Sequence, residues 1–203
     1  MRLKQLVEAV GDKVDIEWRS FLLRPDPEPR DPGKFAEYTK SWERPAGLEP
    51  SAGFNTPWSG EHAPPSHSMP SAVAGKVAAT FGEDPARAYH QHLLDAYFVQ
   101  NRTVSETDVL VDVAVEAGID RAEFVQRFDE QWNTFVQEVV DDHNAAINSG
   151  ISGVPAVVVD GRYLIGGAVD VAEYERAIEF VLDERRNSAD SDHSGSVDHR
   201  SDG

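Results

Sequence analysis

The sequence predicts an α/β protein in which a small sheet is interrupted by a block of helices. Strand-like alternation of apolar and charged residues occurs early in the chain, at residues 14–20, and returns after residue 150. Between these regions, over residues 71–148, apolar residues recur at helical spacing. A chain of 203 residues suits one domain of ordinary to large size with an inserted subdomain.

The first part of the chain combines a helical, a strand and a loop pattern. Residues 3–10 carry apolar side chains at helical spacing, and Gly11 is typical of a helix C-cap. Val14, Ile16 and Trp18 then alternate with charged residues, which predicts a strand. Four prolines in "RPDPEPRDPG", residues 24–33, predict a loop.

The middle of the chain is expected to be mainly helical. A short helix is expected over residues 34–42, and irregular structure over the Pro-, Gly- and Ser-rich residues 43–70. Four helices are then expected at residues 71–82, 85–100, 105–118 and 120–146. Ser105 and Asp108 predict a capping box for the third of these, and Asp120 with Glu123 predicts one for the fourth.

The closing segment reads as a hairpin followed by a helix. The runs "AVVV" and "RYLI" are joined by Asp160-Gly161, and Asp-Gly between two such runs is a strong signal for a β-hairpin. Asp170 and Glu173 are expected to cap a last helix that continues through Val181. Residues 187–203 have almost no apolar side chain and predict a disordered acidic tail.

The charge balance limits the partners that the protein can have. The formal net charge is −17, with 36 acidic residues, 19 basic residues and only five lysines. A field of this sign repels phosphate backbones, so nucleic-acid binding is not expected. Scarce lysine and acidic residues spread along the whole chain favour a salt-adapted protein from a halophilic archaeon.

Several kinds of site are not expected from these residues. The sequence has no cysteine, which excludes disulfides and thiol catalysis within the 203 residues. The histidine spacings match no zinc motif, so no metal site and no cofactor are expected. The chain lacks both a signal peptide and an apolar run long enough to cross a membrane, and a cytoplasmic location is expected.

Three stretches of the chain resemble the DsbA family of thioredoxin-like proteins, in the FrnE and 2-hydroxychromene-2-carboxylate isomerase-like branch. They are "VDIEWRSFLLRPDPEP", "AYFVQNRTVSETDVLVDVAVEAGID" and "AAINSGISGVPAVVVDGRYLIGGAVDVAEYERAI". The resemblance implies a thioredoxin-like fold with an inserted helical domain. Residues 1–30 and 150–186 would form the thioredoxin-like part, 31–149 the loop and helical insert, and 187–203 the tail.

The resemblance also implies a substrate-binding site. The proline that matches Pro155 is cis in the family, and the residue before it offers backbone groups to an extended substrate segment. Gly153, Val154 and Pro155 are therefore the expected substrate-binding turn, and the expected partner is a thiol- or disulfide-containing protein or a small thiol such as glutathione. His67 is a weaker candidate, because its segment opens the first helix of the insert, which flanks the active-site groove in the family.

The redox motif of the family is missing from this sequence. The Cys-x-x-Cys is expected upstream of Met1, together with the first, central strand of the sheet, so no catalytic residue is assigned within the chain. The resemblance implies a thiol–disulfide oxidoreductase. The alternatives are an isomerase or glutathione-transferase-kappa-like enzyme, and a non-catalytic thioredoxin-fold module that binds peptides.

Overall fold

The computed structural model describes residue 6, residues 10–11 and residues 14–194 of the chain. The polypeptide forms two compact units. The first unit combines Met1–Glu17 with Ile151–Gly203, and the second is Trp18–Gly150. Residues 19–24 make hydrogen bonds within the second unit. The expected division into a thioredoxin-like part, residues 1–30 and 150–186, and an insert, residues 31–149, stays a prediction.

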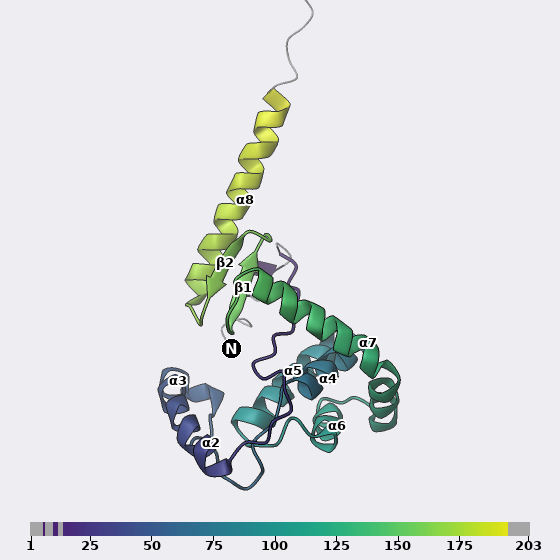
Figure 1. The fold of residues 1–203 in the computed structure, drawn as a ribbon. Coiled ribbons are helices and arrows are strands. Elements are labelled where there is room, and N and C mark those ends of the chain that lie inside the picture. Colours follow the sequence, from purple (N-terminus) through teal and green to yellow (C-terminus); the bar gives the residue numbers. More distant parts are fainter. Residues whose placement is uncertain (1–5, 7–9, 12–13, 195–203) are drawn as a thin grey trace, which may run out of the picture. The chain divides into compact units, whose positions relative to one another are not determined.

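The second unit is built mainly from helices (Figure 1). In chain order they are α2 (Pro32–Thr39), the 3-10 helix η2 (Lys40–Trp42), α3 (Glu43–Leu48), the 3-10 helix η3 (Pro50–Ala52), α4 (Met69–Ala79), α5 (Glu83–Phe98), α6 (Thr107–Glu116) and α7 (Arg121–Asn148). The helices expected between residues 34 and 148 are all present. The region 43–70, expected to be irregular throughout, contains α3 and η3.

Helices α4, α5, α6 and α7 enclose the main hydrophobic core of this unit. Val73 and Val77 of α4 and Leu110 of α6 are fully buried. Phe124 of α7 stacks on Tyr89 of α5, with ring centroids 5.6 Å apart. Burying one large apolar side chain stabilises a protein by roughly 1.5–3 kcal/mol, so these contacts hold the four helices together.

A second group of side chains, here called the aromatic cluster, joins α2 and η2 to the end of α5. Its aromatic members are Phe35, Trp42, Phe54, Trp58, Tyr97 and Phe98. The Trp42 ring lies 5.4 Å from the ring of Tyr97 and 5.1 Å from that of Phe98. These contacts order the chain between α3 and α4, where regular structure is scarce.

Two of the three capping predictions, those for α6 and α7, can be compared with the cap geometry, and their outcomes differ. Asp120 caps α7 as expected, because its side chain accepts a hydrogen bond from the Glu123 N–H at 2.9 Å. The prediction for Ser105 is wrong, since Glu106 occupies the N-cap position of α6 and makes no capping hydrogen bond. The Ser105 hydroxyl instead accepts a hydrogen bond from the Ser66 N–H at 3.1 Å.

The expected strand at residues 14–20 is not present. The Ser20 N–H donates to Asp142 Oδ2 at 3.0 Å, and the Leu22 N–H donates to His143 Nδ1 at 3.2 Å. A backbone segment forms a strand only when a neighbouring strand takes up its hydrogen bonds. At Ser20, the last residue of the segment, a side chain of α7 does so, and residues 14–19 pair with no strand among the described residues.

Asp142 of α7 is the buried acceptor that holds residues 19 and 20 against this helix. Its carboxylate accepts hydrogen bonds from Lys76 Nζ at 2.7 Å and from Arg19 Nη1 at 2.9 Å, in addition to the Ser20 N–H. Burial by itself would raise the pKa of Asp142, but hydrogen bonds from Lys76, Ser20 and Arg19 lower it below its ordinary value. The charged form of Asp142 thus ties the start of the second unit to α4 and α7.

The first unit holds the one sheet found in the described residues, an antiparallel hairpin. Strand β1 (Ala156–Val159) pairs with β2 (Tyr163–Gly166), and the register places Val157 opposite Ile165. Asp160 and Gly161 both have positive φ, and the Val159 carbonyl accepts a hydrogen bond from the Arg162 N–H at 3.1 Å. The predicted Asp-Gly hairpin is therefore confirmed.

Helix α8 (Val171–Ser194) runs beside this hairpin (Figure 1). Its buried residues Tyr174 and Ile178 form a small core with Leu6 and Val10, and the inner face of the hairpin packs against it. Leu6 and Val10 are helical, and the other residues of the helix expected at 3–10 lie outside the described residues.

The disordered tail expected from residue 187 is not found as far as Ser194, because α8 continues to that residue. Residues 195–203 lie outside the described residues. None of the helices in the part of the chain that the structure describes has the length and apolar character needed to span a lipid bilayer.

Candidate functional site

The turn at Gly153, Val154 and Pro155 leads directly into β1. Its Val154–Pro155 peptide bond is cis, which is the geometry that the family resemblance implies. The Pro155 carbonyl accepts a hydrogen bond from the Gly167 N–H at 2.8 Å, so the residue after β2 fixes this turn. The Val154 side chain is 52% exposed, and the turn is therefore open to solvent.

The edge of β1 that faces away from β2 is here called the outer edge, and it is formed by the backbone of Val154, Ala156 and Val158. Hydrogen-bonded positions alternate along an antiparallel strand. Because Pro155 bonds to Gly167, the residues on either side of it direct their backbone groups away from β2. Within the described residues, no second strand pairs with β1 on this edge, and no hydrogen bond reaches the Val154 backbone.

An exposed strand edge is suited to binding an extended peptide segment, which adds to the sheet as a further strand. Each backbone hydrogen bond formed in this way contributes about 0.5–1.5 kcal/mol. Val154 and Val158 are also about half exposed, at 52% and 46% of the residue surface. The outer edge therefore offers a bound segment both hydrogen bonds and apolar contacts.

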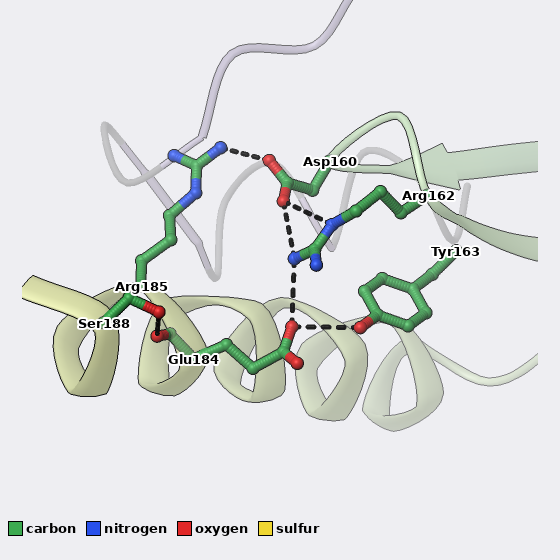
Figure 2. Close-up of polar contacts among 6 residues, drawn as sticks. All are labelled: Asp160, Arg162, Tyr163, Glu184, Arg185 and Ser188. Carbon is green, nitrogen blue, oxygen red and sulfur yellow. Dashed lines mark hydrogen bonds and ion pairs between the residues drawn. The ribbon is translucent and has the colours of Figure 1, made fainter.

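A polar network fixes the other end of the hairpin to α8, as Figure 2 shows. Asp160 forms ion pairs with Arg185 and, at 2.9 Å, with Arg162. Glu184 of α8 accepts hydrogen bonds from Arg162 Nη2 and from the Tyr163 hydroxyl, both at 2.9 Å. The network holds the hairpin loop on the helix, so β1 is anchored at the end opposite Val154.

The electrostatics of this network follow from its hydrogen bonds. The hydrogen bond from Arg185 lowers the pKa of Asp160, and Arg162 acts in the same direction. The hydrogen bond to Glu184 raises the pKa of Tyr163. The carboxylate of Asp160 is thus charged and the Tyr163 phenol neutral across the physiological pH range, which preserves every contact of the network.

His67 lies just before α4 and is partly buried. Its Nδ1 is 2.8 Å from the Ser66 hydroxyl oxygen, and the Ser66 N–H donates to Ser105 Oγ at 3.1 Å. His67 belongs to the second unit, whereas Gly153, Val154 and Pro155 belong to the first. A substrate contact of His67 therefore stays a prediction.

Sequence reasoning missed the network around Glu184 and the cluster around Asp142. Arg162 and Glu184 are 22 positions apart, and Arg19 and Asp142 are 123 apart. Neither separation matches the spacing of contacts within a helix or a strand, so no local pattern predicts these pairs. The only local indication is that Asp142 and Glu184 each lie near apolar residues of their helices.

The described residues offer no arrangement of three or more His, Cys, Asp or Glu that could hold a metal ion. All buried polar side-chain atoms in this part of the chain have a hydrogen-bond partner. What the candidate site supplies is backbone hydrogen bonding from the outer edge.

Two solved structures with a similar fold are named as a disulfide reductase and a probable oxidoreductase. The structure aligns with the cytosolic disulfide reductase DsbM from Pseudomonas aeruginosa, solved with GSH, at a TM-score of 0.68 and 18% identity over 91% of each chain. It aligns with the probable DsbA oxidoreductase SCO1869 from Streptomyces coelicolor at a TM-score of 0.62 and 22% identity, over 90% of this chain and 82% of that one.

A relative found by sequence also aligns with most of the chain. The uncharacterized protein YwbO of Bacillus subtilis (strain 168) is 25% identical over 174 residues, which cover 83% of this chain and 82% of YwbO. The fold is the thioredoxin-like DsbA fold, mostly helical with a small sheet, and the expected fold class is confirmed. Residues 1–179 match the family model of the DSBA-like thioredoxin domain, and the chain belongs to this family.

Proposed function

We propose that the protein is a thiol–disulfide oxidoreductase of the DsbA/FrnE type, acting on protein disulfides. The observation that carries the proposal is the family match over residues 1–179. The names of the structural neighbours, a disulfide reductase and a probable DsbA oxidoreductase, support the same reaction class.

In the proposed mechanism, the backbone of Val154, at the end of the outer edge, binds an extended segment of the substrate beside the reacting sulfur. The central strand expected upstream of Met1 pairs with β1 along the rest of that edge. A thiolate attacks one sulfur of the substrate disulfide, which forms a mixed disulfide and releases the other sulfur as a thiolate. A second cysteine then attacks the mixed disulfide. The products are an oxidised enzyme and a reduced substrate, and the reverse sequence oxidises a dithiol.

The proposal requires cysteines that these 203 residues do not contain. We place them in a Cys-x-x-Cys encoded upstream of the Met1 codon, at the start of a helix. Unpaired N–H groups and the helix dipole at such a position lower a cysteine pKa and favour the reactive thiolate.

The first test is to translate the DNA upstream of the Met1 codon in frame and to express the extended protein. Its rate of insulin reduction with dithiothreitol is compared with that of its Cys→Ser variant and of the 203-residue chain. The extended protein is expected to be faster than both. A stop codon before any Cys-x-x-Cys, or equal rates for the extended protein and its Cys→Ser variant, would refute the proposal.

Glutathione is the proposed small-molecule substrate, and the protein is proposed to act in the cytoplasm. The neighbour solved with GSH is described as cytosolic, which supports both parts of this proposal. The measurement is reduction of glutathione disulfide by the extended protein, with the Cys→Ser variant as the control. Activity toward insulin without any toward glutathione disulfide would restrict the protein to protein substrates.

The absence of cysteine favours one second candidate, a non-catalytic module that binds peptides along the outer edge. This module predicts peptide binding by the 203-residue chain and no disulfide exchange by any extended form. The isomerase or glutathione-transferase-kappa-like alternative predicts glutathione binding without insulin reduction. The same set of proteins therefore separates the three candidates.

A further inference from the structure

Arg30 lies against the aromatic cluster of the second unit. Its guanidinium carbon is 3.9 Å from the centroid of the Phe35 ring and 5.6 Å from that of the Tyr38 ring. The side chain is partly buried. Contact with the ring faces occupies the flat sides of the guanidinium, and a side-chain hydrogen bond joins its N–H edge to Tyr97.

Arg30 has no carboxylate partner among the described residues. Arg30, Lys34 and Arg44 are the basic residues in this part of the chain for which no ion pair is found, and the other two are exposed. Acidic residues outnumber basic ones by 36 to 19 in the whole chain. Arg30 is partly buried without such a partner, so its charge is available to an anion from outside the chain.

Other polar groups surround the same guanidinium. Burial lowers the pKa of Arg30, the nearby charge of Arg24 acts in the same direction, and Tyr97 and Tyr38 act in the opposite one. Arg24 donates from Nε to the Ser66 carbonyl at 3.0 Å. Its acidic neighbour Glu28 is 3.9 Å away and 76% exposed, so that ion pair is weak.

We propose that Arg30, with Arg24, Tyr38 and Tyr97, forms a binding site for the carboxylate of a small organic acid. The guanidinium edge matches the two oxygens of a carboxylate in a bidentate pair. Two neighbouring positive charges stabilise an anion between them. The proposal does not depend on the redox function.

The surroundings favour an organic monocarboxylate over inorganic phosphate. The Tyr38 side chain is 58% exposed and offers an aromatic face to the apolar body of the ligand. The net charge of −17 repels a doubly charged anion more strongly than a singly charged one.

The test is isothermal titration calorimetry of the 203-residue chain with benzoate at constant ionic strength. Benzamide, which has the same ring without the charge, and inorganic phosphate are the comparison ligands. Benzoate is expected to bind, benzamide to bind at least tenfold more weakly, and phosphate to bind more weakly than benzoate. Benzamide binding as tight as benzoate, phosphate binding tighter than benzoate, or no benzoate binding would overturn the proposal.

Two variants and a matched control locate the site. R30Q is expected to weaken benzoate binding at least tenfold. R44Q removes the same charge from an exposed, unpaired arginine, and its affinity for benzoate is expected to lie within twofold of the wild type. R30K keeps a positive charge near Phe35 and is therefore expected to fold. Because lysine lacks the planar guanidinium and its paired N–H donors, at least threefold weaker benzoate binding is expected. Equal effects of R30Q and R44Q, or wild-type affinity for R30K, would overturn the assignment to Arg30.

Discussion

Replacing Asp142 by asparagine is expected to destabilise the second unit by about 3 kcal/mol. The Asp142 side chain is only 4% exposed and pairs with Lys76, which is 22% exposed, and with Arg19, which is 61% exposed. Breaking a buried ion pair by removing one partner costs about 3–5 kcal/mol, whereas an exposed pair contributes at most about 1 kcal/mol. Because the asparagine side chain would still accept from the Ser20 N–H, and Glu138 lies 3.7 Å from Lys76, the lower end of the range applies.

The assay is urea unfolding at a constant potassium chloride concentration, followed by circular dichroism at 222 nm. The control is D141N, which makes the same chemical change at the neighbouring exposed residue, where Gln137 is the hydrogen-bond partner. D141N is expected to change the free energy of unfolding by less than about 0.5 kcal/mol. If D142N lies within about 0.5 kcal/mol of the wild type, or if both variants lose the same amount, the role given to the buried carboxylate is wrong.

The difference in unfolding free energy between the wild type and D142N is expected to depend on pH. The folded protein lowers the pKa of Asp142. The stability from its charged form is therefore complete above the unfolded pKa of about 3.9 and is lost as the pH falls through the folded value. The difference in unfolding free energy between the wild type and D142N is expected to narrow below about pH 4.

Three further predictions concern the core, the hairpin and the surface charge. F124A is expected to lower the free energy of unfolding by about 3–5 kcal/mol, because Phe124 is fully buried. The control V115A, at a 44% exposed position, should lower it by less than about 1 kcal/mol, and similar losses in the two variants would argue against the assigned core. R162M removes contacts of Arg162 to Asp160 and Glu184 and should speed amide hydrogen exchange in β1 and β2. R186M removes contacts of Arg186 within α8, to Asp183 and to the Leu182 carbonyl, and should leave the exchange of the hairpin unchanged; equal exchange rates in the two variants would count against the network. Raising potassium chloride from about 0.2 to about 2 M should raise the melting temperature, because salt screens repulsion within a chain of net charge −17; a fall would contradict salt adaptation.

Local patterns were reliable where the residues that make the structure are close in sequence. Apolar spacing located α4 to α7, and Asp160-Gly161 located the hairpin, because helix and tight-turn hydrogen bonds join residues at most a few positions apart. The cap at Asp120 was predicted for the same reason.

Patterns that need a distant partner were less reliable. Residues 14–20 have the alternation of a strand, but side chains of α7 accept the hydrogen bonds of Ser20 and Leu22. Ser105 has the sequence of an N-cap, but its hydroxyl accepts from Ser66, 39 positions earlier. Competition from partners far away in the sequence decided both cases.

The sequence by itself determined the family, the hairpin and the turn at Val154 and Pro155, since each rests on motifs of neighbouring residues. Only the tertiary structure decided that Asp142 is the buried partner of Lys76 and that Arg30 lies on the Phe35 ring with no carboxylate beside it among the described residues. Whether a charge is paired depends on which elements pack together, and packing brings together side chains whose separation along the chain carries no signal.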